Sequence, residues 1–359
     1  MVKLHCSMAR YKRFHLKFAR MRRKANAKLA DVARAAGVSL STASRALADA
    51  ELVHERTRAR VREAAAMLGY MPHGAARALA TRRSRTVGAV FPPVDNPIFA
   101  AATQALAHEL ASRGYTLLLA THEYDPVGEL AAARALLERG VDGLVLVGMD
   151  HHPDLYRMLA QSEVPYELAW SIDPAGYQHC IGVPHRLASI RLTQHLLDLG
   201  HREFAAIAGS TGRNDRARDR LTGTREALAS HGIELPPERV VETYFSLGHG
   251  QRALRDLLER APGFTAVVCG NDLLALGALH ECARRGIAVP REMSVAGFDD
   301  IEMAAVATPP LTTVRVPAAD IGRLAAERML ARIAGEHVAA VEELRVELIV
   351  RESTGRAPA

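Results

Sequence analysis

A short stretch between residues 39 and 45 carries side chains that suit hydrogen bonding to nucleic acid. It places three serines, a threonine, a leucine and an arginine within seven positions: Ser39, Leu40, Ser41, Thr42, Ser44 and Arg45. Hydroxyl groups both donate and accept hydrogen bonds, and arginine pairs with phosphate or with a guanine edge. At the N-terminal end of a helix, such groups fit the major groove of DNA. The alternative is an ordinary helical hairpin with a solvated polar face.

A second set of polar and aromatic residues is scattered through the rest of the chain, where predicted strands end. Its members are Asn96, Phe99, Trp170, Arg220, Asn271 and Asp299. Amide and carboxylate groups pair with hydroxyls, a flat ring covers the apolar face of a sugar, and an arginine also accepts a carboxylate. This set predicts a site for a small sugar or sugar acid. Asn271 and Asp299 could instead cap helices, and Trp170 could belong to the core or a dimer interface.

Other residue types form no pattern that predicts catalysis or metal binding. The histidine pairs His151–His152 and His179–His185 lack a third ligand nearby, so we expect them on the surface or in loops. The stretch Gly209–Gly212 lacks the lysine of a phosphate-binding loop. Cys180, Cys269 and Cys282 are scattered like reduced core thiols, as expected in the cytoplasm. We therefore predict no enzymatic activity, no metal and no cofactor.

Two short helices must position the polar stretch at residues 39–45. The apolar residues of 29–36 recur at helical spacing, Gly37 ends that helix, and Ser39 can cap the next one. We expect the second helix over Leu40–Ala48 to bury Ala43 and Leu47. A third helix over Glu55–Leu68 should turn Val61, Ala65 and Leu68 inward, and Pro72 blocks its continuation.

Charge is distributed unevenly along the 359 residues. Residues 1–28 hold ten basic residues and no acidic ones, residues 29–86 have a net charge of +5, and the remainder has −9. A basic N-terminal part on an acidic body is expected where only that part meets phosphate. For residues 1–25 three interpretations stay open: translation that starts at Met21 in the cell, a disordered basic arm, or a transit peptide.

From Thr86 onward, apolar runs alternate with amphipathic segments. The expected strands are Thr86–Phe91, Thr116–Ala120, Gly143–Val147, Tyr166–Trp170, Cys180–Val183, Phe204–Ala208, Val240–Tyr244, Ala266–Cys269, Ser294–Phe298 and Thr312–Val316. The expected helices include Ile98–Arg113, Glu129–Arg139, Arg186–Leu199 and Leu273–Arg285, and Arg220 should open a further helix. Alternation of this kind predicts α/β architecture with parallel sheets covered by helices, and a ligand at the carboxyl ends of the strands. No apolar run reaches membrane-spanning length, so we expect no membrane partner.

Specific motifs in both parts resemble the lactose-repressor family of bacterial transcription regulators, in family order from about residue 28 to 355. In the N-terminal part these are the run from Asp31 to Leu47, then Val53, Thr57-Arg58, Val61, Leu68-Gly69-Tyr70, Pro72, Ala76-Arg77 and Leu79. In the rest they are Gly200-His201-Arg202, Arg220 to Gly223, Asn271-Asp272, Ala275, Gly277, Val289-Pro290, Ser294 to Asp300, Pro310 to Thr313 and Arg351 to Gly355.

The resemblance implies a small helix-turn-helix head over residues 26–72 and a hinge helix over 73–83. A hinge this short is marginal alone and would fold when paired on DNA. There Leu79 would wedge between base steps, with His73 and Ala76 beside it, while Tyr70 would contact the DNA backbone or pack against the head. Arg220, Asn271, Asp299 and Phe99 stand where the family binds its effector.

The resemblance also implies a two-lobed core over residues 84–359, like a periplasmic sugar-binding protein. We expect lobe 1 over about 84–185 and 317–338, and lobe 2 over about 186–316 and 339–355. The sequence departs from the family at Ala48 and His73, where asparagine is usual, and at Pro184-His185, where Asp-Asn is usual. That last change leaves the role of His185 in doubt.

Together these observations predict a cytoplasmic, sequence-specific transcription regulator, most often a repressor in such a family. It would bind a pseudopalindromic double-stranded operator as a homodimer and respond to a small effector in the core cleft. A solute-binding protein without a regulatory role is the alternative. The head and the lack of an apolar secretory segment favour the regulator.

Overall fold

The computed structural model describes residues 27–47, 53–71 and 83–358. They fall into two compact units, which divide the chain between Ser84 and Arg85. The predicted basic extension over residues 1–25, Ala48, and the hinge residues His73, Ala76 and Leu79 lie outside the described residues.

The described residues of the N-terminal unit contain three helices: α2 (Leu29–Ala35), α3 (Leu40–Leu47) and α4 (Glu55–Leu68). The turn after α2 uses Gly37 at φ +63°, and α4 ends at Gly69 in the left-handed conformation at φ +62°. Val32, Ala43 and Val61 meet in its fully buried core. The predicted helix-turn-helix is therefore present.

Two predicted core positions of the head are wrong. Ala46 is fully buried in place of Leu47, which is only half-buried. Leu68 is 42% exposed, and Ala64 occupies the inner face with Val61 and Ala65. Leu47 still packs against this core, whereas Leu68 is the last residue of α4 and lies beyond the part of the helix that the core covers.

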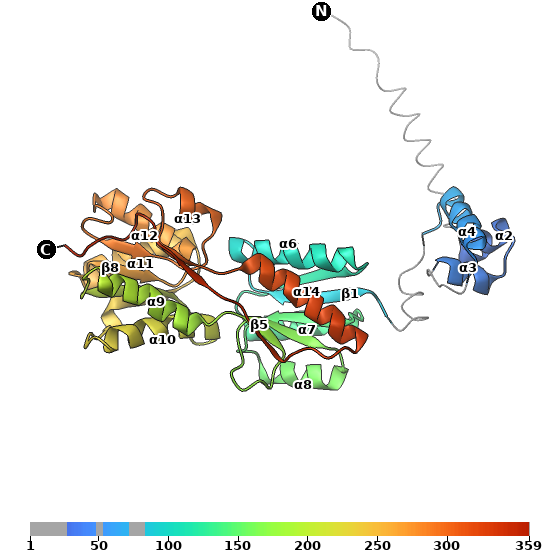
Figure 1. Cartoon of the computed structure of the whole chain (residues 1–359), viewed down its shortest axis with the longest axis horizontal. Helices are drawn as coiled ribbons and strands as arrows, with labels where there is room; N and C mark the ends of the chain where they lie inside the picture. The colour runs from blue at the N-terminus through green and yellow to red at the C-terminus, as the bar shows by residue number, and fades with distance from the viewer. Residues whose placement is uncertain (1–26, 48–52, 72–82, 359) are drawn as a thin grey trace, which may run out of the picture. The chain divides into compact units, whose positions relative to one another are not determined.

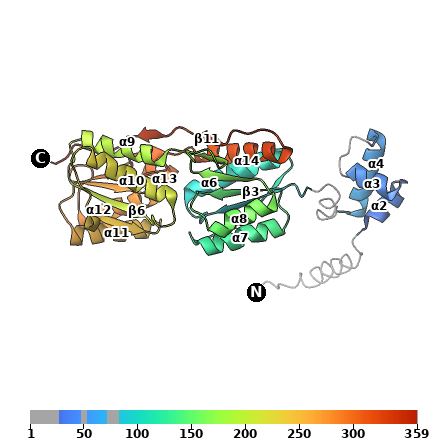
Figure 2. The same ribbon diagram turned by 90° about the horizontal axis from the view of Figure 1, so that it is seen from below.

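The C-terminal unit has two lobes, each a parallel sheet between helices (Figures 1 and 2). The lobe 1 sheet has the order β11-β5-β4-β3-β1-β2 and consists of β1 (Thr86–Phe91), β2 (Thr116–Thr121), β3 (Gly143–Val147), β4 (Tyr166–Trp170), β5 (Cys180–Gly182) and β11 (Val341–Glu343). Its helices are α6 (Pro97–Ser112), α7 (Pro126–Glu138), α8 (Pro153–Ser162) and α14 (Ala318–Ala334). Helices α6 and α14 lie on one face and α7 and α8 on the other (Figure 2).

Lobe 2 repeats this plan with a four-stranded parallel sheet in the order β7-β6-β8-β9. The strands are β6 (Phe204–Gly209), β7 (Val240–Thr243), β8 (Ala266–Cys269) and β9 (Ser294–Ala296). The helices are α9 (His185–Asp198), α10 (Asp215–Ala229), η1 (Pro237–Arg239), α11 (Leu247–Arg260), α12 (Asp272–Arg285) and α13 (Glu302–Val306). Helices α9 and α10 cover one face and α11 and α12 the other (Figure 2).

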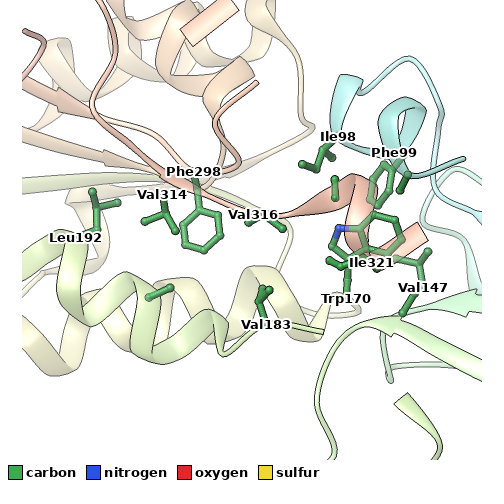
Figure 3. Close-up of a cluster of buried hydrophobic side chains, with 14 of the residues drawn as sticks. Ile98, Phe99, Val147, Trp170, Val183, Leu192, Phe298, Val314, Val316 and Ile321 are labelled. Carbon is green, nitrogen blue, oxygen red and sulfur yellow. The ribbon is translucent and has the colours of Figure 1, made fainter. Parts of the chain in front are cut away.

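The chain passes between the lobes through short crossovers. One joins β5 to α9 at Val183–His185, and a second joins β10 (Thr313–Arg315) to α14. A third joins β11 to β12 (Glu347–Ile349), which pairs with β10 in an antiparallel ribbon. Buried apolar side chains line these crossovers and connect the two lobes, as Figure 3 shows for Trp170, Val316 and Phe298.

The last crossover corrects the predicted lobe boundary. Residues 339–355 were expected in lobe 2, but Val341–Glu343 pairs with β5 in the lobe 1 sheet. The chain therefore returns to lobe 2 only after Glu343. Arg220 also does not open a helix as predicted, because α10 begins five residues earlier at Asp215.

Candidate functional site

The exposed face of α3 contains the predicted DNA-contacting side chains. Ser39, Leu40, Ser41, Ser44 and Arg45 are exposed and Thr42 is half-buried. The hydroxyl of Ser39 accepts a hydrogen bond from the Thr42 backbone N–H at 3.1 Å, so Ser39 caps the helix as expected. Its oxygen also lies 2.9 Å from the Ser41 hydroxyl and 2.8 Å from that of Thr42. This small network fixes the first turn of α3.

Tyr70 directly follows the end of α4. Its backbone N–H donates to the carbonyl of Ala65, and its half-buried ring packs against the head core. Packing was one of the two interpretations left open for this residue. Because the ring is partly exposed, its contact with the DNA backbone stays a prediction.

The structure brings all six predicted effector residues around one cavity between the lobes. Asn96, Phe99 and Trp170 come from lobe 1, and Arg220, Asn271 and Asp299 from lobe 2. The reason is the one used in the prediction: parallel strands end at a common edge, and the two edges face each other across the cleft. The free volume among these side chains is only about 20 Å³, roughly one water molecule.

Asn271 caps α12, as the alternative interpretation proposed, and Asn96 caps α6, which the sequence analysis did not predict. Asp299 does not cap the following helix, because the N-cap position of α13 is Ile301. The Asn96 side-chain oxygen accepts from the Ile98 N–H at 3.4 Å, and that of Asn271 accepts from Leu274 at 3.0 Å. Capping uses the side-chain oxygen. The amide NH2 groups therefore remain the part that these residues can offer a ligand.

Trp170 belongs to an aromatic cluster at the lobe 1 side of the cavity. Its ring centroid lies 5.0 Å from that of Phe99 in an edge-to-face arrangement (Figure 3). The Phe91 ring, also edge-to-face, is 5.5 Å away between centroids. The residue is 2% exposed, so the core interpretation is correct, yet it also lines the cavity. Its indole N–H has no hydrogen-bond partner among the described residues. A ligand that accepts this hydrogen bond would remove the cost of burying an unpaired donor.

Arg220 is the most constrained side chain of the site. Its Nε donates to His185 Nδ1 at 3.2 Å, and one Nη1 N–H donates to the Gly270 carbonyl at 2.5 Å. The guanidinium carbon lies 4.1 Å from the centre of the Phe298 ring. Asp299 Oδ1 is 3.6 Å from Nη1, which is an ion pair without a close hydrogen bond.

Burial changes the acid–base behaviour of this ion pair. Desolvation raises the pKa of Asp299 to about 6, although Arg220 and Arg216 oppose the shift. The same burial lowers the pKa of Arg220, while Asp299 opposes that change. Asp299 can therefore present either a carboxylate or a carboxylic acid to a ligand near neutral pH.

A larger pocket of about 590 Å³ adjoins the cavity and shares Tyr124, Asn214 and Phe245 with it. Its wall includes three aromatic rings, with Tyr124 6.4 Å from Tyr244 and 5.9 Å from Phe245. This volume suits a small ligand. The prediction missed these residues, although Tyr124, Asn214 and Phe245 follow β2, β6 and β7 and the same rule would have found them.

Polar contacts at the start of α10 join the lobes directly. The carboxylate of Asp215 accepts from the Met149 N–H at 3.2 Å and from the Ser171 hydroxyl. Arg218 pairs with Asp150 at 2.7 Å. Arg216, bonded to Asp215 at 2.7 Å, lies against Gly148. We call Asp215, Arg216 and Arg218 the α10 latch.

The predicted surface or loop position is wrong for His185, which is the first residue of α9, whereas His151 lies in the loop between β3 and α8 as expected. Neither side chain, however, is exposed. His151 is almost fully buried and lies 2.9 Å from both carboxylate oxygens of Glu129, and His185 is 2% exposed in the crossover. Their partners are 22 and 35 residues away, beyond the reach of local spacing. Within the described ranges no cluster of three or more His, Cys, Asp or Glu forms a metal site. No described helix has the length and hydropathy to span a membrane.

Comparisons with known proteins find similar families for both units of the chain. Residues 28–73 match the model of bacterial regulatory proteins of the lacI family, and residues 193–354 match a periplasmic binding protein-like domain. The chain is 31% identical to the HTH-type transcriptional repressor CytR of Escherichia coli K12, over 92% of this chain and 97% of that protein. It is 35% identical to the HTH-type transcriptional regulator GntR of Pseudomonas aeruginosa, over 91% and 95%.

A solved structure resembles nearly the whole chain. The lac repressor dimer bound to operator and the anti-inducer ONPF has a TM-score of 0.81 and 27% identity, covering 92% of this chain and all of that one. The relatives named by these comparisons are transcription regulators.

Proposed function

The chain belongs to the lacI family of bacterial regulatory proteins, DNA-binding transcription regulators, and from this premise we propose that it represses genes from a pseudopalindromic operator. It does so as a homodimer controlled by a sugar or sugar acid in the cleft between its lobes. One observation carries the proposal: a chain with an exposed polar recognition face on α3 also holds Arg220 and Asp299 at an interlobe cavity.

The α3 face supports the DNA-binding part of the proposal. Its exposed hydroxyls and Arg45 have the size and hydrogen-bonding capacity to reach base edges in a major groove. The basic balance of residues 1–86 adds attraction to phosphate that depends on salt but not on sequence. Acting on DNA requires the protein to work in the cytoplasm.

Dimerisation follows from the size of the recognition element. One head covers only half of an operator, and two heads related by a two-fold axis cover two inverted half-sites. The resembling lac repressor structure is described as a dimer on operator. A solute-binding protein, the alternative, would not need the head.

The cleft supports the effector part of the proposal. Arg220 and Asp299 offer a donor and an acceptor side by side, and Trp170 adds a buried donor without a partner among the described residues. Hydroxyls satisfy all three, and a carboxylate can accept from Arg220. Binding would alter the angle between the lobes and thereby the spacing of the hinge segments, including Leu79. Effector and operator affinities are then coupled reciprocally.

Selection of bound sequences from random DNA, followed by fluorescence anisotropy at fixed salt, tests the DNA-binding proposal. We expect an inverted repeat, and Arg45→Ala should weaken its binding by about tenfold, within the range of one base contact. Arg34→Ala is the matched control, because Arg34 is an exposed arginine at the end of α2. Sequence-independent binding by the wild type would overturn the proposal.

A thermal-shift screen of sugars and sugar acids tests the effector, since a ligand that binds the folded state raises its melting temperature. Arg220→Met should remove the shift of any hit. A hit that shifts this variant equally would place the ligand elsewhere.

A further inference from the structure

His185 stands where the chain crosses from lobe 1 to lobe 2, at the first residue of α9. Its ring is buried and makes two hydrogen bonds with different lobes. Nε2 lies 2.8 Å from the carbonyl oxygen of Trp170, at the end of β4, and Nδ1 lies 3.2 Å from Nε of Arg220, on α10. The ring therefore bridges the last residue of a lobe 1 strand and the arginine of the cleft.

The two partners determine the proton on this ring. A carbonyl only accepts, so Nε2 must carry the hydrogen, and the guanidinium Nε only donates, so Nδ1 must be free of one. Only the neutral Nε2–H tautomer satisfies both contacts. A doubly protonated ring would direct a second N–H at the N–H of Arg220 and place two positive charges side by side.

The surroundings also disfavour a charged ring. The charged residues that line the same pocket as His185 are Asp150, Arg186, Asp215, Arg218, Asp219, Glu226 and Glu343. Arg216 and Arg220 of α10 also act on the ring, and Asp299 pairs with Arg220. These two arginines lie close enough to lower the pKa of His185, but burial lowers it most, to well below its usual value. The N-terminal end of α9 adds a positive dipole at the same place.

An aromatic ring also packs against the His185 side chain. The ring of Phe298 lies 5.7 Å from His185, inclined by 31°, and the Arg220 guanidinium lies over the same ring. Trp170 adopts φ +70°, a conformation that bulky residues rarely adopt. Its carbonyl is the one that accepts from His185.

We infer that His185 is a positioning residue, which holds Arg220 in place through the neutral Nε2–H tautomer and links that arginine to lobe 1 through the Trp170 carbonyl. The bridge fixes Nε and leaves Nη2 of Arg220 as the group that can turn to a ligand. When the angle between the lobes changes, Trp170 moves relative to α10, and His185 passes this movement to Arg220. This consequence for effector control rests on the proposed function, whereas the positioning itself does not.

Nuclear magnetic resonance of the full chain with ¹⁵N-labelled histidine and arginine tests the positioning without any ligand or DNA. One imidazole should stay in the neutral Nε2–H form at pH 5.5, where an ordinary histidine is about 90% protonated. That signal should vanish in His185→Asn. A His185 signal that titrates near pH 6.5, or that shows the Nδ1–H tautomer, would overturn the inference.

Two variants separate positioning from packing. Asparagine at 185 can accept from Arg220 and donate to Trp170, so His185→Asn should keep the Arg220 Nε–H protected from solvent exchange. His185→Phe preserves ring volume but no hydrogen bond, and should lose that protection. The bridge would be contradicted if the Arg220 Nε–H were equally protected from exchange in both variants. It would also be contradicted if both variants lost this protection equally. If His185→Phe does not fold, the tautomer and the titration of the His185 ring in the wild type still decide.

The pH dependence of unfolding gives an independent readout. The folded state keeps His185 neutral, whereas the unfolded state takes up a proton below about pH 6.5. Between pH 7.5 and 5.5 the unfolding constant of wild type should therefore rise about tenfold relative to that of His185→Asn. His231→Asn, at an exposed histidine, should follow wild type. Parallel pH profiles for wild type and His185→Asn would refute the neutral ring, whatever the outcome of the DNA and effector experiments.

Discussion

Gly148 offers the sharpest test of how the lobes are held together. It adopts φ +92°, and a Cβ at this position would lie 1.8 Å from Nη1 of Arg216 and 2.8 Å from a carboxylate oxygen of Asp215. In Gly148→Ala the α10 latch must therefore move away from lobe 1. Since Arg216 is 6% exposed and bonded to Asp215, it cannot simply turn into solvent.

Two costs contribute to the expected loss of stability. The left-handed backbone costs alanine about 1 kcal/mol. Displacement of a buried, charge-assisted hydrogen bond adds about 2 kcal/mol. Gly176→Ala isolates the first cost, because Gly176 has φ +72° but open space around its Cβ position. We expect a total loss of about 3 kcal/mol for Gly148→Ala and about 1 kcal/mol for Gly176→Ala.

Calorimetry of the effector-free chain measures the difference, at about 2–4 °C of melting temperature for each kcal/mol in a domain of this size. Small-angle scattering should also show a larger radius of gyration for Gly148→Ala alone, since its lobes cannot approach as closely. Equal melting temperatures for the two variants would show that the latch contributes nothing to the closed arrangement, and the reasoning would fail.

Two further carboxylates give separate predictions. Glu167 is fully buried between Arg328, at 2.6 Å, and Arg332, at 3.4 Å, so Glu167→Gln should cost about 3 kcal/mol in denaturant unfolding. Glu327→Gln at a partly exposed pair should cost less than about 1 kcal/mol, and similar losses would contradict the role of burial. Glu281 accepts hydrogen bonds from arginine side chains that lower its pKa well below the ordinary 4.5. The stabilisation by ionised Glu281 is complete above pH 4.5 and is lost as the pH falls toward the pKa of the folded state. Glu281→Gln should therefore reduce the pH dependence of the unfolding free energy below about pH 4.5. An unchanged pH dependence in that range would contradict this role of Glu281.

Local patterns were sufficient for most of the secondary structure. Strands such as Gly143–Val147 are apolar throughout because helices cover both faces of the sheet. The short strands β11 and β12 were missed, because Val341–Glu343 and Glu347–Ile349 are only three residues long and each contains glutamate. Their pairing is decided by neighbours far away in the sequence, which is also why the lobe boundary after Glu343 was misplaced.

In the site, too, some residues could be predicted from local sequence and others depend on contacts between distant parts of the chain. Asp299 could be predicted because it follows a strand that ends at the cleft edge of the sheet. Arg220 lies inside α10, so the resemblance to the family predicted it and the strand-end rule did not. His185 could not, because its partners Trp170 and Arg220 lie on either side of it in sequence and meet only after the crossover forms. Long-range hydrogen bonds of buried histidines leave no periodic trace in the sequence.

The nature of the interlobe contacts constrains how an effector can act. The α10 latch consists of charge-assisted polar bonds, and exchanging each of them for bonds to water has a net cost of about 2 kcal/mol. The buried apolar side chains along the crossovers, such as Val316 and Phe298, keep the two lobes in contact where the chain passes between them. A ligand that converts a strongly open population into a strongly closed one must favour the closed form by about 5.5 kcal/mol. Because Nε and Nη1 of Arg220 already have partners in His185 and Gly270, a ligand is left to pair with Nη2 of that arginine and with the Trp170 indole N–H.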